Sequence, residues 1–197
     1  MASTRTHHPL STSDTHPILV DFIPDIHRYF PGRLGMTIAP GKQNYGMQFN
    51  WKRDLAQDLE RLRNHYHTDL LVTLIEKPEL TLLKIPSLFE DIAAVGMESR
   101  WFPIRDFGTP TSMAGLMELV EDIFFQALAE GKTVVVHCKA GLGRSGLVVA
   151  ACLVALGYEP DAAFARVRAA RPGSVETTEQ EDYVKQFAMA WVARDRS

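Results

Sequence analysis

The sequence predicts an α/β domain in which a mostly parallel central sheet carries helices on both faces. Apolar runs of strand length alternate with helical patterns, which is typical of parallel strands joined by helices. One such run, 133–136, leads through a loop with two glycines into an apolar helical segment. A chain of 197 residues with 46% hydrophobic content is also large enough to bury a single core.

The elements are expected in the following order. Residues 1–16 are rich in Ser, Thr, His and Pro and are expected to form a flexible tail ahead of a single domain at 17–197. Two histidines in this tail, His7 and His8, are not expected to bind a metal. Strands are expected in apolar or β-branched runs that end at turn residues, at 18–23, 34–39, 70–75, 99–104 and 133–136. Helices are expected where apolar residues recur every three or four positions, at 52–66, 86–95, 113–129, 147–156, 160–170 and 177–194.

Composition limits the classes of partner. Lys and Arg number 21 against 24 Asp and Glu, a balance that predicts no nucleic-acid partner. No apolar run reaches the length of about 18 residues that a membrane helix needs, so no membrane partner is expected. The chain has two cysteines and no signal-peptide pattern, which predicts a reduced, cytoplasmic protein. Cys152 is expected in the core; alternatively, it traps an oxidised Cys138 as a disulfide.

The chemistry is expected in the loop after the strand at 133–136. The loop reads His137-Cys138-Lys139-Ala140-Gly141-Leu142-Gly143-Arg144-Ser145. It lies at a helix N-terminus, where free backbone N–H groups and the helix dipole attract anions, so a phosphate or another oxyanion is expected there. The same surroundings favour the thiolate form of Cys138, which is the nucleophilic form. Arg144 can donate to two phosphate oxygens at once, and Gly141 and Gly143 let successive N–H groups point inward.

The five residues between Cys138 and Arg144, with His137 before and Ser145 after, resemble the signature of the cysteine-dependent protein tyrosine and dual-specificity phosphatases. The resemblance implies a protein tyrosine phosphatase-like fold and hydrolysis of phosphotyrosine, and also of phosphoserine or phosphothreonine, in a protein or peptide. It implies that Cys138 forms a phosphocysteine intermediate, that Ser145 helps the thiolate leave and that His137 supports the loop. It also implies a phosphate-binding set without cofactor or metal: Lys139, Ala140, Gly141, Leu142, Gly143 and Arg144.

Asp106 is the candidate general acid, because an alkoxide or phenoxide leaves slowly unless it is protonated. It lies in a turn-rich segment after the strand at 99–104, although an aspartate there can also serve only to cap the turn. The segment 102–110 resembles the general-acid loop of dual-specificity phosphatases, above all of the cyclin-dependent-kinase-associated branch. The resemblance implies that Asp106 protonates the leaving oxygen and then activates water.

Gln180 has two interpretations of equal weight. The segment 168–180 resembles the part of the family in which a glutamine helps to place the hydrolytic water. The run Thr177-Thr178-Glu179-Gln180 also fits a helix capping box, in which the glutamine only binds back to the Thr177 N–H.

Other functions fit parts of the loop. Residues 141–146 match the dinucleotide fingerprint G-x-G-x-x-G, but no second strand ending in an acidic residue follows. The presence of all three expected catalytic residues argues against a phosphoprotein-binding module without turnover. A redox or sulfur-transfer enzyme would not need Asp106. Inositol lipids are not favoured, because Leu142 stands where the phosphoinositide branch has a second basic residue and leaves Lys139 alone. The short chain implies a shallow cleft that admits phosphoserine and phosphothreonine.

Overall fold

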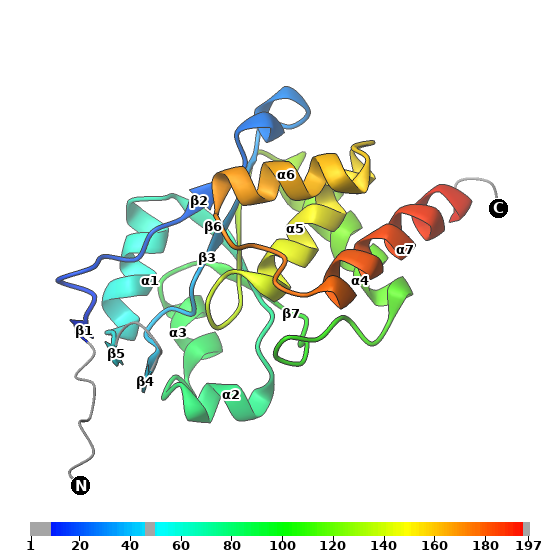
Figure 1. The fold of residues 1–197 in the computed structure, drawn as a ribbon. Coiled ribbons are helices and arrows are strands. Elements are labelled where there is room, and N and C mark those ends of the chain that lie inside the picture. The colour runs from blue at the N-terminus through cyan, green and yellow to red at the C-terminus, as the bar shows by residue number, and fades with distance from the viewer. Residues whose placement is uncertain (1–8, 46–49, 195–197) are drawn as a thin grey trace, which may run out of the picture.

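The computed structural model describes residues 9–45 and 50–194. Its central sheet has five strands in the order β2-β3-β8-β6-β7 (Figure 1). These strands are β2 (Asp21–Phe22), β3 (Arg33–Thr37), β8 (Thr133–His137), β6 (Thr68–Thr73) and β7 (Glu98–Trp101). All neighbouring pairs are parallel except β2 and β3, which are antiparallel. The predicted α/β class is therefore confirmed, and the sheet is mixed because its short edge strand runs the opposite way.

Helices cover both faces of the sheet (Figure 1). Helices α1 (Leu55–Asn64) and α3 (Leu88–Ala94) lie on one face, and the short α2 (Lys77–Leu82) follows β6. The other face carries α4 (Met113–Glu121) with its π-helical continuation (Asp122–Leu128), α5 (Gly143–Ala155), α6 (Pro160–Ala170) and α7 (Thr178–Arg194). No helix in the described part of the chain is long and apolar enough to cross a bilayer.

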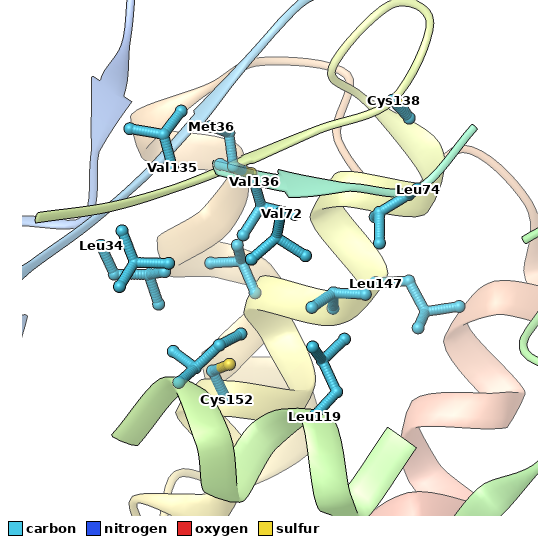
Figure 2. Close-up of a cluster of buried hydrophobic side chains, with 14 of the residues drawn as sticks. Leu34, Met36, Val72, Leu74, Leu119, Val135, Val136, Cys138, Leu147 and Cys152 are labelled. Atoms are coloured by element: carbon cyan, nitrogen blue, oxygen red, sulfur yellow. The ribbon is translucent and has the colours of Figure 1, made fainter. Parts of the chain in front are cut away.

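The core extends over both faces of the sheet, toward α1 and α3 on one side and toward α4 to α7 on the other. Strand β8 is buried along its whole length, and α5 is buried from Gly143 to Val154. Figure 2 shows side chains of β3, β6 and β8 packing against α5, with Leu147 inside the cluster and Leu119 of α4 closing its far side. Burial on all sides explains why α5 has an apolar sequence without a polar face. The loop that precedes α5 is therefore held between two rigid, buried elements.

A second, smaller sheet was not predicted. Strands β1 (Leu10–Ser11), β5 (Asn50–Lys52) and β4 (Gln43–Tyr45) form it, with β5 in the centre. The Asp54 N–H donates to Ser13 Oγ (2.9 Å), and Ser11 and Ser13 are buried. The expectation of a flexible tail is thus wrong for residues 9–16, because these contacts hold a polar segment against the domain. His7 and His8 lie outside the described residues.

Several predicted boundaries move for local reasons. Helix α1 begins at Leu55 rather than at residue 52, because Asp54 Oδ1 caps it by accepting from the Gln57 N–H (2.9 Å) and residues 50–52 form β5. Helix α5 begins at Gly143, four residues before the expected start. Helix α2 was not predicted, since six residues are too few for a clear periodic pattern.

Candidate active site

The loop 138–142 joins buried strand β8 to buried helix α5. Leu142 is the N-cap residue of α5, and its carbonyl accepts from the Gly146 N–H (2.8 Å). Gly141 has a φ of +70°, and a Cβ atom there would lie 2.2 Å from the carbonyl oxygen of Thr37 in β3. Only glycine combines a positive φ with this close backbone approach, so the tight turn of the loop requires glycine at position 141.

Cys138 lies where β8 gives way to the loop, at the edge of the hydrophobic cluster (Figure 2). Its side chain is 3% exposed. It interacts electrostatically with the guanidinium of Arg144 and the ammonium of Lys42. The sulfur therefore lies in the electrostatic field of two positively charged side chains.

Arg144, in the first turn of α5, is 2% exposed and is held on three sides. Its Nη1 and Nη2 atoms donate to the Glu79 carboxylate at 2.6 and 3.0 Å, and Nη1 also donates to the Ile104 carbonyl (3.0 Å). Its Nη2 donates to Asp106 Oδ1 (2.8 Å). Burial opposes the charge, but Glu79, Cys138 and Asp106 outweigh it and raise the pKa of Arg144 above its ordinary value. The guanidinium is thus a permanent, rigidly oriented cation.

Glu79 is a site residue that sequence reasoning missed. It lies at the N3 position of α2, where its side chain also accepts from the Glu76 N–H (2.8 Å). The capping box of α2 therefore fixes the same carboxylate that orients Arg144. Residues 76–79 carried the local signal of a helix start, with an acidic N-cap, a proline and a glutamate three positions later.

Asp106 lies in the segment after β7, and the structure brings it to Lys139 of the loop 138–142 and to Arg144. Its carboxylate bonds to Arg144, and its Oδ2 lies 3.7 Å from the Nζ atom of Lys139. The segment is anchored on both sides, since the Ile104 N–H donates to the Leu74 carbonyl (2.9 Å) and the Gly108 carbonyl accepts from Gln180. The Asp106 side chain is 39% exposed, so a bound substrate can reach it.

Ser145 follows Arg144 in the first turn of α5. Its hydroxyl is buried and has no hydrogen-bond partner among the described residues. A buried hydroxyl without a partner is costly, by roughly 1–3 kcal/mol. The site thus holds an unused donor beside the nucleophile loop.

Gln180 is buried at the start of α7 and connects this helix to the Asp106 segment. Its Nε2 donates to the Gly108 carbonyl (3.1 Å), and its Oε1 accepts from the Glu176 N–H (2.9 Å). The Gln180 N–H donates to Thr177 Oγ1 (3.2 Å), which is one half of a capping box. The other half differs from the expected one, because the Gln180 side chain accepts from the Glu176 N–H and not from the Thr177 N–H. The same amide group also donates to the Gly108 carbonyl of the Asp106 segment.

Glu176 also escaped the sequence analysis. Its Oε2 accepts from the Gly143 N–H at 2.8 Å. This N–H is one of the free donors at the start of α5, so a carboxylate already uses part of the electropositive helix end. No local pattern links residues 143 and 176, which meet only in the folded chain.

His137, the last residue of β8, contacts both the loop and strand β6. Its ring is buried, and its Nδ1 and Nε2 atoms lie 3.3 Å from the Cys138 carbonyl and 2.9 Å from Thr73 Oγ1. A carbonyl only accepts, so Nδ1 carries the proton and Nε2 accepts from the threonine. Burial lowers the pKa of His137 to about 4, so the ring is neutral near pH 7.

The structure does not bring the two cysteines together. Cys152 lies well inside α5, and Figure 2 shows Cys138 and Cys152 at opposite ends of the cluster. Its thiol is buried, and burial raises its pKa. Cys152 therefore packs as a core residue, which was the first of its two predicted roles.

No group of three or more His, Cys, Asp or Glu side chains within residues 9–45 and 50–194 is arranged to hold a metal ion.

Comparisons with known proteins agree on one family. The model of the family described as "Polymorphic toxin system, DSP-PTPase phosphatase" matches residues 45–158. Cyclin-dependent kinase inhibitor 3 of Homo sapiens is 30% identical over 157 residues, which cover 78% of this chain and 71% of that protein. The protein of the same name from Rattus norvegicus is 28% identical over 174 residues, with 87% and 79% covered.

Solved structures lead to the same family. Kinase associated phosphatase (KAP), solved with its catalytic-site cysteine replaced by serine, superimposes with a TM-score of 0.79 at 26% identity. The match covers 89% of this chain and 97% of that one. The active form of Tk-PTP gives a TM-score of 0.68 at 30% identity and covers 86% and 96%. The chain therefore belongs to the dual-specificity family of cysteine-dependent protein tyrosine phosphatases, near the cyclin-dependent kinase inhibitor 3 branch, and is a protein phosphatase.

Proposed function

We propose that Cys138 is the nucleophile of this phosphatase, Arg144 the phosphate ligand and Asp106 the general acid. The observation that supports this assignment is that Arg144 interacts electrostatically with Cys138 and bonds at 2.8 Å to Asp106, which comes from a different segment of the chain. The backbone N–H groups of the loop supply the remaining donors for the phosphate oxygens, apart from that of Gly143, which donates to Glu176. One anion can then touch all of these groups at once.

The reaction follows in two steps. The Cys138 thiolate attacks phosphorus, so that a P–S bond forms and the P–O bond to the leaving group breaks while Asp106 gives its proton to the leaving oxygen. Water then attacks the phosphocysteine, Asp106 takes a proton from it, and the P–S bond breaks to return the thiolate. Ser145 donates its unused hydroxyl hydrogen to the departing sulfur, which stabilises the thiolate in the second step.

Gln180 serves the second step, in our proposal, by holding the Asp106 segment at the Gly108 carbonyl. From this place its amide group also lies near the loop, since a Cβ atom on Gly143 would be 3.0 Å from it. Gln180 thus lies between the Asp106 segment and Gly143 at the start of α5, where its amide group can orient the attacking water.

The substrate class we propose is a phosphorylated protein that presents phosphotyrosine, phosphoserine or phosphothreonine. Asp106 and Phe107 are partly exposed, and so is Lys139 beside them, so a phosphorylated side chain on a protein surface can approach this segment. Lys139 is the only lysine in the loop 138–142, which supplies one cation beside the phosphate and disfavours polyphosphorylated inositol lipids. A thiolate nucleophile requires a reducing compartment, and we propose the cytoplasm.

A substrate panel tests the proposal. The wild-type protein, with chelator present, is expected to hydrolyse p-nitrophenyl phosphate and both phosphotyrosine and phosphothreonine peptides, and to show a burst of leaving group equal to the enzyme concentration. The Cys138→Ser variant is expected to lose turnover while it still binds vanadate or phosphopeptide. Activity of this variant above a hundredth of the wild type would overturn the nucleophile assignment.

A further inference from the structure

Lys42 is a buried lysine that the proposed reaction does not use. It lies in the turn between β3 and β4 and is 4% exposed. The Gly41 N–H donates to Asp58 Oδ2 (2.9 Å), and Asp58 forms a buried ion pair with Arg53 through two contacts of 2.7 Å. The turn is therefore fixed in place. Lysines are almost never buried so deeply unless the charge has a partner.

The ammonium group points at the base of the nucleophile loop. Its Nζ atom donates to the Lys139 carbonyl at 3.1 Å and lies 3.8 Å from the centre of the Trp51 ring. Lys139 directly follows Cys138 in the chain. The aromatic face stabilises the charged form of the lysine, so the site is built to hold a cation there.

The contact with the Lys139 carbonyl belongs to a series. Three successive loop carbonyls each accept from a basic side chain outside the loop: Cys138 from His137 Nδ1 (3.3 Å), Lys139 from Lys42 Nζ (3.1 Å) and Ala140 from Arg171 Nη2 (2.9 Å). In a planar trans peptide the carbonyl and the next N–H point in opposite directions. Holding these carbonyls outward turns the N–H groups of residues 139–141 inward, toward the phosphate.

Lys42 differs from the other two members in its charge environment. The His137 ring is neutral near pH 7, and Arg171 forms an ion pair with Asp21. Among the described residues no carboxylate pairs with Lys42. The charged groups that act on it are the guanidiniums of Arg53 and Arg171, the Lys139 ammonium and the Cys138 sulfur, which is the one anion among them.

We propose that Lys42 is a positioning residue for the nucleophile: its ammonium stabilises the Cys138 thiolate from behind the loop and holds the Lys139 carbonyl away from the phosphate. The inference rests on the assignment of Cys138 as the nucleophile. The negative charge on Cys138 stabilises the Lys42 ammonium, and the ammonium stabilises the negative charge by the same free energy. The Ala39 N–H also donates to the Lys139 carbonyl, at 3.4 Å, so the positive charge is what distinguishes Lys42 from this second donor.

The pH range of the effect follows from burial. Burial lowers the pKa of Lys42 to about 7, against the opposing influence of the Cys138 charge. The lysine is therefore charged in mildly acidic solution and loses its charge above neutrality. The electrostatic support that Lys42 gives to Cys138 is therefore greatest at acidic pH.

Four variants of the full chain test the inference. Lys42→Met keeps the length of the side chain and removes charge and donor; Lys42→Gln keeps a donor without charge; Lys42→Arg keeps both. Lys52→Met is the matched control, because Lys52 is an exposed lysine in the neighbouring strand β5. The readouts are the pH midpoint of inactivation by iodoacetamide, kcat/KM for p-nitrophenyl phosphate from pH 5 to 9, and the thermal unfolding temperature.

We expect Lys42→Met and Lys42→Gln to raise the alkylation midpoint by at least one pH unit and to lower kcat/KM at pH 5.5 at least tenfold, with a smaller loss at pH 8. Lys42→Arg should stay within threefold of the wild type, and Lys52→Met should match it. The unfolding temperature of Lys42→Met should be equal or higher, because a buried charge has been removed.

An unchanged alkylation midpoint in Lys42→Met would overturn the inference, whatever its stability. So would equal losses in Lys42→Met and Lys42→Arg that parallel a fall in unfolding temperature, since that pattern marks a packing role. Activity retained in Cys138→Ser would instead remove the proposed nucleophile, and this result is distinguishable from both others.

Discussion

Glu79 holds Arg144 through two charged hydrogen bonds, of 2.6 and 3.0 Å, at a place where the guanidinium is almost completely buried. The carboxylate is fixed in turn by the capping box of α2. The orientation of the Arg144 guanidinium therefore depends on a six-residue helix, α2. The first prediction concerns this pair.

Replacing Glu79 by Gln is expected to lower kcat/KM by roughly 10–100-fold, because a misplaced guanidinium no longer matches the phosphate oxygens. The free energy of unfolding should fall by about 2 kcal/mol, the usual loss for a hydrogen bond to a charged group. Steady-state kinetics and urea unfolding measure both. Glu90→Gln, an exposed change in α3, is the control; equal effects in the two variants would contradict the role of the pair.

Replacing Asp106 by Asn is expected to reduce kcat by roughly 10²–10⁴-fold with a poor leaving group, since no proton is available for the leaving oxygen. The loss should be smaller with p-nitrophenyl phosphate, whose leaving group needs less protonation. Vanadate should bind more tightly, because the Asp106 carboxylate no longer occupies an Arg144 donor. A loss that is independent of the leaving group would assign the acid elsewhere. Asp182→Asn, an exposed change in α7, serves as the control.

Replacing Ser145 by Ala should leave the protein as stable as before or slightly more stable, since the lost hydroxyl is buried without a partner. The phosphocysteine should accumulate, because the departing thiolate loses a hydrogen bond worth roughly 10–100-fold in rate. Rapid-quench kinetics would show a full burst followed by a slower steady state. A slower burst with an unchanged steady state would place Ser145 in the first step instead.

Replacing Gly141 by Ala should destabilise the fold by about 2–5 kcal/mol, because backbone strain adds to the overlap with the Thr37 carbonyl. Gly131 is a matched control, with a φ of +83° and open space around its Cβ position. Gly131→Ala should cost only about 1–2 kcal/mol for the strain alone. Chemical denaturation of both variants measures the difference, and equal costs would show that the close approach is unimportant.

The neutral, buried His137 predicts an acid-sensitive stability. Its pKa is about 4 in the folded chain against 6.5 for the free side chain, so between these values the unfolded state binds more protons. The free energy of unfolding should therefore fall as pH drops from 6.5 to 4, by about 3 kcal/mol in total. Denaturation curves of the wild type and His137→Asn across this range test the point. A difference between the two that does not vary with pH would contradict it.

The fold and the reactive loop could be predicted because their signals are local. The run from Val134 to Gly146 carries strand, loop and helix in one continuous pattern, and Asp106 lies in a recognisable turn. The edge strand β2 runs antiparallel, which no local pattern of two residues can show. Glu79, Glu176 and Lys42 were missed for another reason, since each meets the loop from far away in the sequence and looks like an ordinary surface residue in its own segment.

The residues that hold the loop 138–142 and the Asp106 segment are widely separated in the chain, from Lys42 to Gln180. We expect contacts between such distant residues to form late in folding, because each contact requires the entropically costly ordering of a long stretch of chain. Phosphatase activity therefore requires that all of these contacts have formed, so it can be used to measure how much of the protein has reached the native state. A fragment that ends before α7 would keep the signature sequence and much of the sheet but would have no working centre, and recovery of turnover after dilution from denaturant should lag behind recovery of helical circular dichroism.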